Sequence, residues 1–165
     1  MKRVIWVLVF LCGCSSTPSD ARFSPPDKSF KIYFPAKPAH ESTKTDSSPV
    51  RTESHSFFVR RSDAQFMLNY LELIPAPGDL KATDALEATL AAAMQKNQGV
   101  GLTKQSSIIG GYPTMTVQMR CRNGAVLDGR FIYVSPRIYQ VMVIHPADKE
   151  PAEMKRFFES FAVNE

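Results

Sequence analysis

The sequence predicts an α+β domain built on a single antiparallel sheet of about six to seven strands. The first observation is the stretch Gly110–Pro146, in which three strand-like runs are separated by Asn123-Gly124 and Ser135-Pro136. Short turns of this kind join antiparallel neighbours. Further alternating runs precede this stretch, and two other segments have helical periodicity. The chain has 165 residues, 44% of them hydrophobic, so it can form one domain with its own core.

The N-terminus predicts a lipoprotein signal peptide over residues 1–13. Two basic residues precede the apolar run Val4–Leu11, which is too short to span a bilayer, since a spanning helix takes about 20 residues. The run Leu11-Cys12-Gly13-Cys14 resembles a bacterial lipobox. On that resemblance, cleavage follows Gly13 and the thiol of Cys14 receives the lipid. An ordinary signal peptide with incidental cysteines is the alternative.

Residues 14–26 are expected to form a lipidated tether, and residues 27–165 the globular domain. The tether is polar and rich in serine and proline, a composition typical of disordered linkers. Several acyl chains on Cys14 would hold the protein stably on a membrane. Ser15 follows at the position where aspartate favours the inner membrane of Gram-negative bacteria. We therefore expect an outer-membrane lipoprotein that faces the periplasm.

The charge and cysteine content exclude two broad classes of protein. The net charge is +4, and removal of Lys2 and Arg3 with the signal peptide would leave about +2. A nucleic-acid-binding protein usually carries a strongly basic surface, so none is expected here. Cys12 would leave with the signal peptide and Cys14 would carry lipid, which leaves Cys121 without a partner. A disulfide-stabilised scaffold is therefore not expected.

The first half of the domain predicts three strands. Phe30–Phe34 alternates apolar and other residues and ends at a proline, which is typical of a half-buried strand. Residues 36–49 are polar with a proline near each end, so we interpret them as a loop. Val50–Val59 and Gln65–Leu73 are strands joined by a hairpin turn at residues 60–64.

Two segments are predicted to be helices. The first runs from Thr83, which we expect to cap it, to Asn97, and Gly99 is a suitable residue to end it. Its apolar residues recur at helical spacing and should face the core: Leu86, Leu90 and Met94. The second helix follows Pro146, with Pro151 in its first turn. Its apolar stripe consists of large side chains: Met154, Phe157, Phe158 and Phe161.

The remaining strands lie between these helices. Leu102–Ile109 is a strand, and Gly110-Gly111 turns the chain into the next one. Ala125–Val134 and Arg137–Ile144 complete the meander. In the strand before Asn123, every second residue is apolar, which predicts one buried face: Met115, Val117, Met119 and Cys121.

Four short segments of the sequence resemble those of a known family. They are Phe30-Lys31-Ile32-Tyr33-Phe34-Pro35, Gly110-Gly111-Tyr112-Pro113, Arg130-Phe131-Ile132-Tyr133-Val134 together with Arg137-Ile138-Tyr139-Gln140-Val141, and Phe157-Phe158-Glu159-Ser160-Phe161. With this order of elements, residues 27–163 resemble the PsbP-like domain family. The resemblance implies a three-layer α/β/α arrangement, with helices on both sides of the antiparallel sheet. It also implies protein binding and assembly rather than catalysis, although one fold hosts many functions. It transfers no functional residue or metal site to a numbered position.

The titratable residues do not form a recognisable reactive motif. His40, His55 and His145 lack two-histidine metal spacing, and Glu53 with His55 would give at most two ligands, so no metal or cofactor is expected. Serine-nucleophile motifs are absent from the sequence. Cys121 lies between two arginines that would lower its pKa, but its apolar alternation partners favour a buried structural thiol. We therefore expect no catalytic residue.

One set of arginines and tyrosines is a candidate binding surface, because aromatic and cationic residues anchor many interfaces. The set consists of Tyr112, Arg120, Arg122, Arg130, Tyr133 and Tyr139. The alternatives are a solvated face for the arginines and core packing for the tyrosines.

These observations predict a non-enzymatic lipoprotein whose domain binds or helps assemble another envelope component, a protein partner that the sequence does not identify. A small-ligand-binding module, with a pocket between sheet and helix, is the alternative. An enzyme whose site is assembled from distant residues would need convergent polar groups in one cleft.

Overall fold

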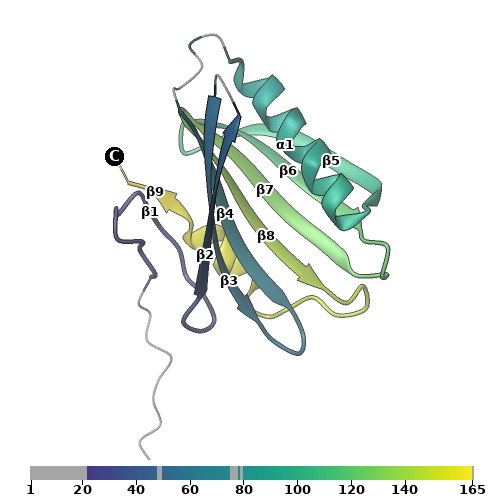
Figure 1. Cartoon of the computed structure of the whole chain (residues 1–165). Coiled ribbons are helices and arrows are strands. Elements are labelled where there is room, and N and C mark those ends of the chain that lie inside the picture. The colour runs from purple at the N-terminus through teal and green to yellow at the C-terminus, as the bar shows by residue number, and fades with distance from the viewer. Residues whose placement is uncertain (1–21, 48–49, 75–77, 79, 165) are drawn as a thin grey trace, which may run out of the picture.

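A seven-stranded antiparallel sheet lies at the centre of the computed structural model, which describes residues 22–164 except 48–49, 75–77 and 79 (Figure 1). Its strands are β2 (Ala39–Ser47), β3 (Val50–Arg60), β4 (Gln65–Ile74), β5 (Val100–Ile109), β6 (Tyr112–Arg120), β7 (Val126–Val134) and β8 (Arg137–His145). The helices are α1 (Ala82–Asn97) and α2 (Met154–Ser160). Two short strands, β1 (Phe30–Lys31) and β9 (Ala162–Val163), form a separate antiparallel pair.

The strand order is β2-β3-β4-β8-β7-β6-β5. The chain first forms two hairpins, then crosses through α1 to the far edge and returns as the meander β5 to β8. The last strand of the meander pairs with β4, where Met67 lies opposite Met142. All these pairings are antiparallel, so the predicted α+β fold on an antiparallel sheet is confirmed.

The turns that the sequence places within the meander are confirmed. Gly110 and Gly111 join β5 to β6 and have φ values of 60° and 86°. This left-handed region costs glycine little but crowds the Cβ of other residues, so two consecutive glycines suit a tight turn. Ile109 and Tyr112 pair directly across it, which fixes the register of the hairpin.

The prediction that residues 36–49 form a loop is wrong for β2. This strand pairs with β3 along its whole length, from Ala39 opposite Phe58 to Ser47 opposite Val50. It is an edge strand, and its residues 39–45 are exposed on both faces. Apolar alternation marks a strand with one buried face, so a strand exposed on both faces lacks the signal.

Helix α1 begins before its predicted cap and ends at Asn97, as predicted. Thr83 lies inside the first turn, and Lys81 occupies the N-cap position without a side-chain hydrogen bond. At that end the residue in the left-handed conformation is Gln98, with φ 49°, and Gly99 is the next residue. Glycine suits position 99 for a packing reason, since a Cβ there would lie 2.5 Å from the Sδ of Met119 and this side chain would have to shift.

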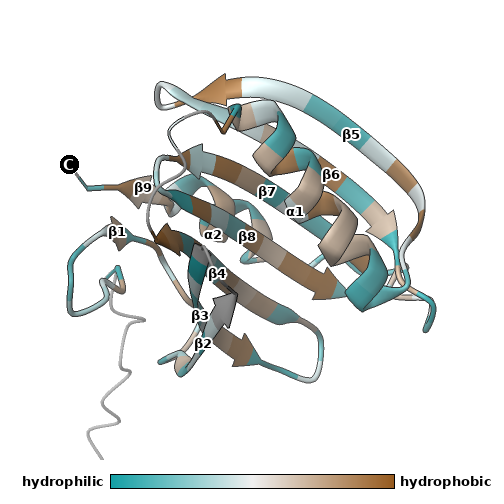
Figure 2. Cartoon of the chain, turned by 45° about the horizontal axis from the view of Figure 1, so that its top comes forward, coloured by the Kyte–Doolittle hydropathy of each residue, from teal (hydrophilic) through white to brown (hydrophobic). Residues whose placement is uncertain are grey.

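The two faces of the sheet carry separate apolar clusters, one under each helix (Figure 2). Helix α1 packs on β6 and β7 through the buried residues Leu86 and Leu90. Successive residues of a strand point to opposite faces, so Phe131 packs under α1 and Ile132 packs on the α2 side. The three-layer arrangement follows from this division.

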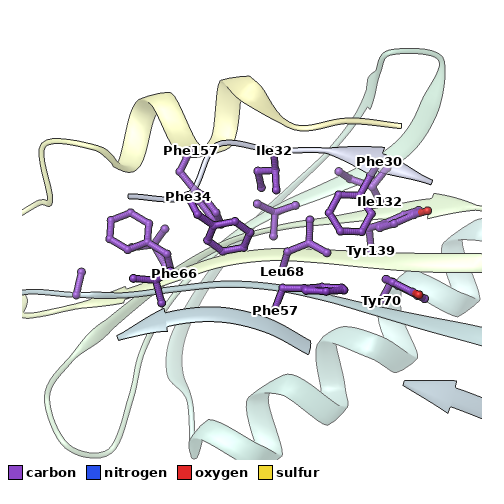
Figure 3. Packing of buried hydrophobic residues seen from close by; sticks show 14 residues of the cluster. Phe30, Ile32, Phe34, Phe57, Phe66, Leu68, Tyr70, Ile132, Tyr139 and Phe157 are labelled. Atoms are coloured by element: carbon purple, nitrogen blue, oxygen red, sulfur yellow. The ribbon is translucent and has the colours of Figure 1, made fainter. Parts of the chain in front are cut away.

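The α2-side cluster is completed by the N-terminal segment (Figure 3). The predicted strand Phe30–Phe34 is shorter than expected, because only Phe30 and Lys31 lie in β1 and pair with β9. Phe30, Ile32 and Phe34 are buried on the main sheet beside Phe157 of α2. This segment and α2 together make the third layer.

Candidate functional site

The predicted set of arginines and tyrosines does not form one surface. Tyr139 is only 1% exposed, so its place on a binding surface is corrected. It lies on β8, a central strand, and its ring packs 5.9 Å from that of Phe30 and 5.4 Å from that of Phe161. Tyr112 packs on the same α2-side cluster, whereas Tyr133 packs on the α1-side cluster across the sheet.

The arginines of the set also have different roles. Arg130 donates a hydrogen bond of 3.1 Å to the carbonyl of Phe158 and lies over its ring, so it fixes α2 to the sheet. Burial lowers the pKa of Arg130. Arg122 donates to the Oε1 of Gln98 at 3.0 Å and ties the β6–β7 turn to the end of α1. Arg120 is exposed at the end of β6.

Strand β5 is an exposed edge that the sequence analysis did not single out. It is the last strand of the sheet, so its outer row of N–H and C=O groups pairs with no strand of the described chain. Three apolar side chains on it are exposed, Val100 at 60%, Ile108 at 75% and Ile109 at 41%. In Figure 2 the arrowhead that ends β5 is coloured as hydrophobic. The signal available in the sequence was the uncharged run that ends in Ile108-Ile109.

His40 and His55 form a stacked pair on β2 and β3. The Nε2 of His40 lies 3.2 Å from the Nδ1 of His55, and their rings stack on Phe57 and Tyr70 respectively. Burial, and then the proximity of His40, lower the pKa of His55. Glu53, the second ligand considered for a metal, forms a 3.0 Å ion pair with Lys44 instead. The described residues contain no group of three side chains suited to a metal ion.

His145 and Asp128 form a second pair, on β8 and β7. The Nε2 of His145 lies 2.9 Å from Asp128, whose other oxygen accepts a hydrogen bond of 2.8 Å from Gln118. The Nδ1 of His145 contacts the carbonyls of Pro146 and Lys149 at 2.7 and 3.1 Å. Both ring nitrogens face acceptors, so the pair holds the loop after β8 rather than exposing a base.

Cys121 is buried, as the alternation of its strand predicts. Burial raises the pKa of the thiol, which disfavours the reactive thiolate. The neighbouring Arg120 and Arg122 are both exposed and do not offset this burial. Across the described chain, every buried side-chain nitrogen and oxygen has a hydrogen-bond partner.

The pocket expected between sheet and helix under the alternative hypothesis is occupied by side chains. Leu86 and Leu90 of α1 pack directly with Val117 and Phe131 of the sheet. A hollow of about 540 Å³ lies instead at the C-terminal end of α1, with Gln98 among its lining residues. Another hollow, of about 410 Å³, lies on the outer side of α2 and is rich in cationic side chains.

The chain has a PsbP-like fold, in agreement with the resemblance seen in the sequence. Its structure is similar to the solution structure of cyanobacterial PsbP (CyanoP) from Synechocystis sp. PCC 6803, with a TM-score of 0.59. The alignment covers 93% of this chain and 97% of that one at 14% sequence identity, so the likeness concerns the fold alone. No family model and no curated protein sequence matches the chain.

The residues that define the predicted anchor, Gly13 and Cys14, lie outside the described part of the chain. Neither of the described helices is both long and apolar enough to cross a membrane.

Proposed function

We propose that this protein is a lipoprotein of the bacterial envelope, anchored in the outer membrane through Cys14 and facing the periplasm. Its domain is non-enzymatic and binds, or helps assemble, another envelope protein. The observation that carries this proposal is the exposed edge of β5, which is suited to accept an additional strand.

The two edges of the sheet differ in the features that prevent strand addition. Charged side chains and bulges protect natural edges. The edge strand β2 carries Glu41 and Lys44 within its length. In β5 the charged residue is Lys104, which pairs with Glu87 of α1, and the strand is uncharged from Gln105 to Ile109, where it ends in two isoleucines. Its register with β6 is regular from Thr103 onward, because the bulge lies before that residue. A partner strand is therefore expected at β5.

Lipid anchoring allows a small, weak interface to form a complex. A single added strand buries little surface, and such contacts are often weak. Confinement of both partners to one membrane raises their effective concentration and compensates for low affinity. The non-enzymatic interpretation is supported by the described polar groups, since the histidines, Cys121 and Asp128 are all held in structural contacts.

Site-specific crosslinking in intact cells tests the partner. A photoreactive amino acid at Ser107, on β5, is expected to capture a specific envelope protein. The matched control is Thr43, which is exposed on the other edge strand. Ile108→Lys should abolish capture without loss of stability, because the side chain is 75% exposed. Equal capture at Thr43, or capture that survives Ile108→Lys, would remove the support for β5.

Mass measurement of the N-terminal peptide tests the anchor. Acylated Cys14 should be the first residue, and Cys14→Ser should release the protein from the membrane fraction. An unmodified Cys14 in membrane-associated protein would contradict the lipoprotein assignment.

A further inference from the structure

A basic hollow lies on the outer side of α2, beside the start of the described chain. It measures about 410 Å³ and is lined by Arg22, Tyr33, Lys155, Arg156 and Glu159 among others. The guanidinium of Arg156 lies 3.9 Å from the centre of the Tyr33 ring, which forms the floor of the hollow. The hollow is thus lined by three cationic side chains, Arg22, Lys155 and Arg156, and by one carboxylate, that of Glu159.

The cationic character extends beyond the hollow. Lys31, two residues before Tyr33 in the chain, is exposed and lines a second hollow together with Asp27 and Lys28. Arg22, Lys31, Lys155 and Arg156 together are called the basic surface below.

Two acids of the described chain near this surface are paired with cations outside it. Asp27 forms a 3.0 Å ion pair with Arg137, and Glu153 forms a 2.8 Å pair with Arg61. Glu159 lies 3.9 Å from Lys155, at the limit of an ion pair, and both side chains are largely exposed. Among the described residues, Glu159 is thus the one acid that lines the hollow together with Arg22, Lys155 and Arg156.

The predicted anchor is close to this surface. Cys14 lies eight positions before Arg22 in the chain. Even fully extended, that segment spans at most about 28 Å. The basic surface is consequently confined near the bilayer, and the charges of lipid headgroups act on it whenever it comes within about 8 Å, the Debye length at physiological salt.

We infer that the basic surface docks on anionic phospholipid headgroups of the membrane that holds the lipid anchor. This inference rests on the anchor of the proposed function and adds an orientation to it. The α2 layer faces the bilayer, and α1, on the opposite side of the sheet, points away. A surface that recognises only charge does not need a deep pocket, and the cationic side chains of this surface are accordingly exposed. Each cation near an anionic membrane increases partitioning onto the membrane by about fivefold.

Vesicle co-sedimentation of the unlipidated chain tests the inference. A chain that starts at Ser15 retains both apolar clusters, whose members lie between Phe23 and Val163, so it keeps the complete core. It should bind vesicles that contain phosphatidylglycerol but not vesicles of phosphatidylcholine alone. High salt should release it, because exposed charges are screened.

Two triple variants with equal loss of charge decide whether the surface is specific. Arg22→Gln, Lys31→Gln and Lys155→Gln together should lower the partition coefficient by about fivefold for each cation removed. The matched control replaces three exposed lysines elsewhere with glutamine: Lys81, Lys96 and Lys149. It should retain binding, and both variants should keep the melting temperature of the parent.

Equal losses in the two triple variants, or no binding to the anionic vesicles, would overturn the inference. If soluble glycerol phosphate, at the same concentration as the phosphatidylglycerol headgroups, released the protein from the vesicles, the hollow would be assigned to a free ligand instead. The vesicle experiment contains no acyl anchor and no protein partner. A negative vesicle result would therefore not count against the lipid anchor or the β5 interface. Negative results in the anchor and crosslinking experiments would likewise not change the interpretation of vesicle binding.

Discussion

His145 is held by acceptors on both sides of its ring, and this makes its charge part of the fold. Burial alone would lower its pKa, but the hydrogen bonds to Asp128 and to the carbonyls of Pro146 and Lys149 outweigh burial and raise the pKa above its usual value of 6.5. The folded state therefore binds a proton more tightly than the unfolded state. The resulting stabilisation is complete below about pH 6.5 and is lost as the pH rises through the raised pKa.

His145→Gln should lower the free energy of unfolding by about 1–3 kcal/mol at pH 6, because Asp128 and two carbonyls lose their charged donor. The difference from the parent should shrink as the pH rises above the raised pKa. Urea unfolding across a pH series measures both effects. His40→Gln, on the exposed strand β2, should change stability little. A difference that is constant with pH would contradict the charged state of His145.

Gly129 lies in β7 at a position where side chains of the sheet leave little space for a Cβ. A Cβ at this position would lie 3.1 Å from the Cγ2 of Val117, 3.4 Å from the Cδ2 of Leu127 and 3.5 Å from the Cγ of Met142. Gly129→Ala should therefore cost about 1–3 kcal/mol through overpacking. Thermal unfolding is the measurement, and Gly78→Ala, with no atom within 4 Å of the added Cβ, is the control.

At the scale of elements, helix α2 is short, and its most deeply buried side chain is Phe157. Phe157 is 0% exposed, and its ring lies 5.2 Å from that of Phe34 and 5.3 Å from that of Phe66. Isolated helices of this length are unstable in water, so tertiary packing holds α2 in place. Loss of this ring should release the helix together with the layer that it completes.

Phe157→Ala should reduce the free energy of unfolding by about 3–5 kcal/mol, the cost of removing a buried aromatic side chain. Denaturant unfolding measures this value. Phe161→Ala, at the half-buried end of the same stripe, should cost less. If both substitutions lowered the free energy of unfolding equally, the burial of a side chain in this stripe would not determine how much it stabilises the fold.

Sequence patterns predicted the elements that have one buried face and one exposed face. Strand β6 and the stripes of both helices have this character, and the structure places them as expected. Strand β2 was missed because both of its faces are exposed, and Thr83 was taken for a cap because its chemistry suits one. Strand β5 is also exposed along nearly its whole length, but it was predicted because it contains Leu102, Ile108 and Ile109, whereas β2 has no apolar residue after Ala39 to mark it as a strand.

The candidate surfaces were harder to predict than the elements, because they depend on strand order. The position of β5 at an edge follows from the pairing of β8 with β4, a contact between distant segments. Tyr139 was assigned to a surface because its sequence neighbours do not show that β8 lies in the middle of the sheet. The basic surface joins Arg22 to Lys155, which are far apart in the chain.

At the scale of the whole molecule, the two ends of the domain are joined. Phe30 pairs with Val163 in the small sheet β1–β9, and the N–H of Asn164 donates to the carbonyl of Ser29 at 3.0 Å. The side-chain amide of Asn164 donates to the carbonyl of Lys28. Because the segment after Arg22 covers the α2-side cluster, its attachment at the C-terminus keeps that cluster closed.

Truncation after Ser160 removes β9 and Phe161, and it should open the N-terminal segment without unfolding the α1 side of the sheet. Amide exchange should rise at Phe30 and Ile32, and trypsin should cleave after Lys28 and Lys31. Exchange in β6 and β7 should change much less, since their buried side chains pack under α1. Truncation after Asn164 keeps every contact between the ends and serves as the control. Uniform exchange across the sheet after the longer truncation would mean that the two layers unfold as one unit and that the closure at the termini stabilises the whole domain.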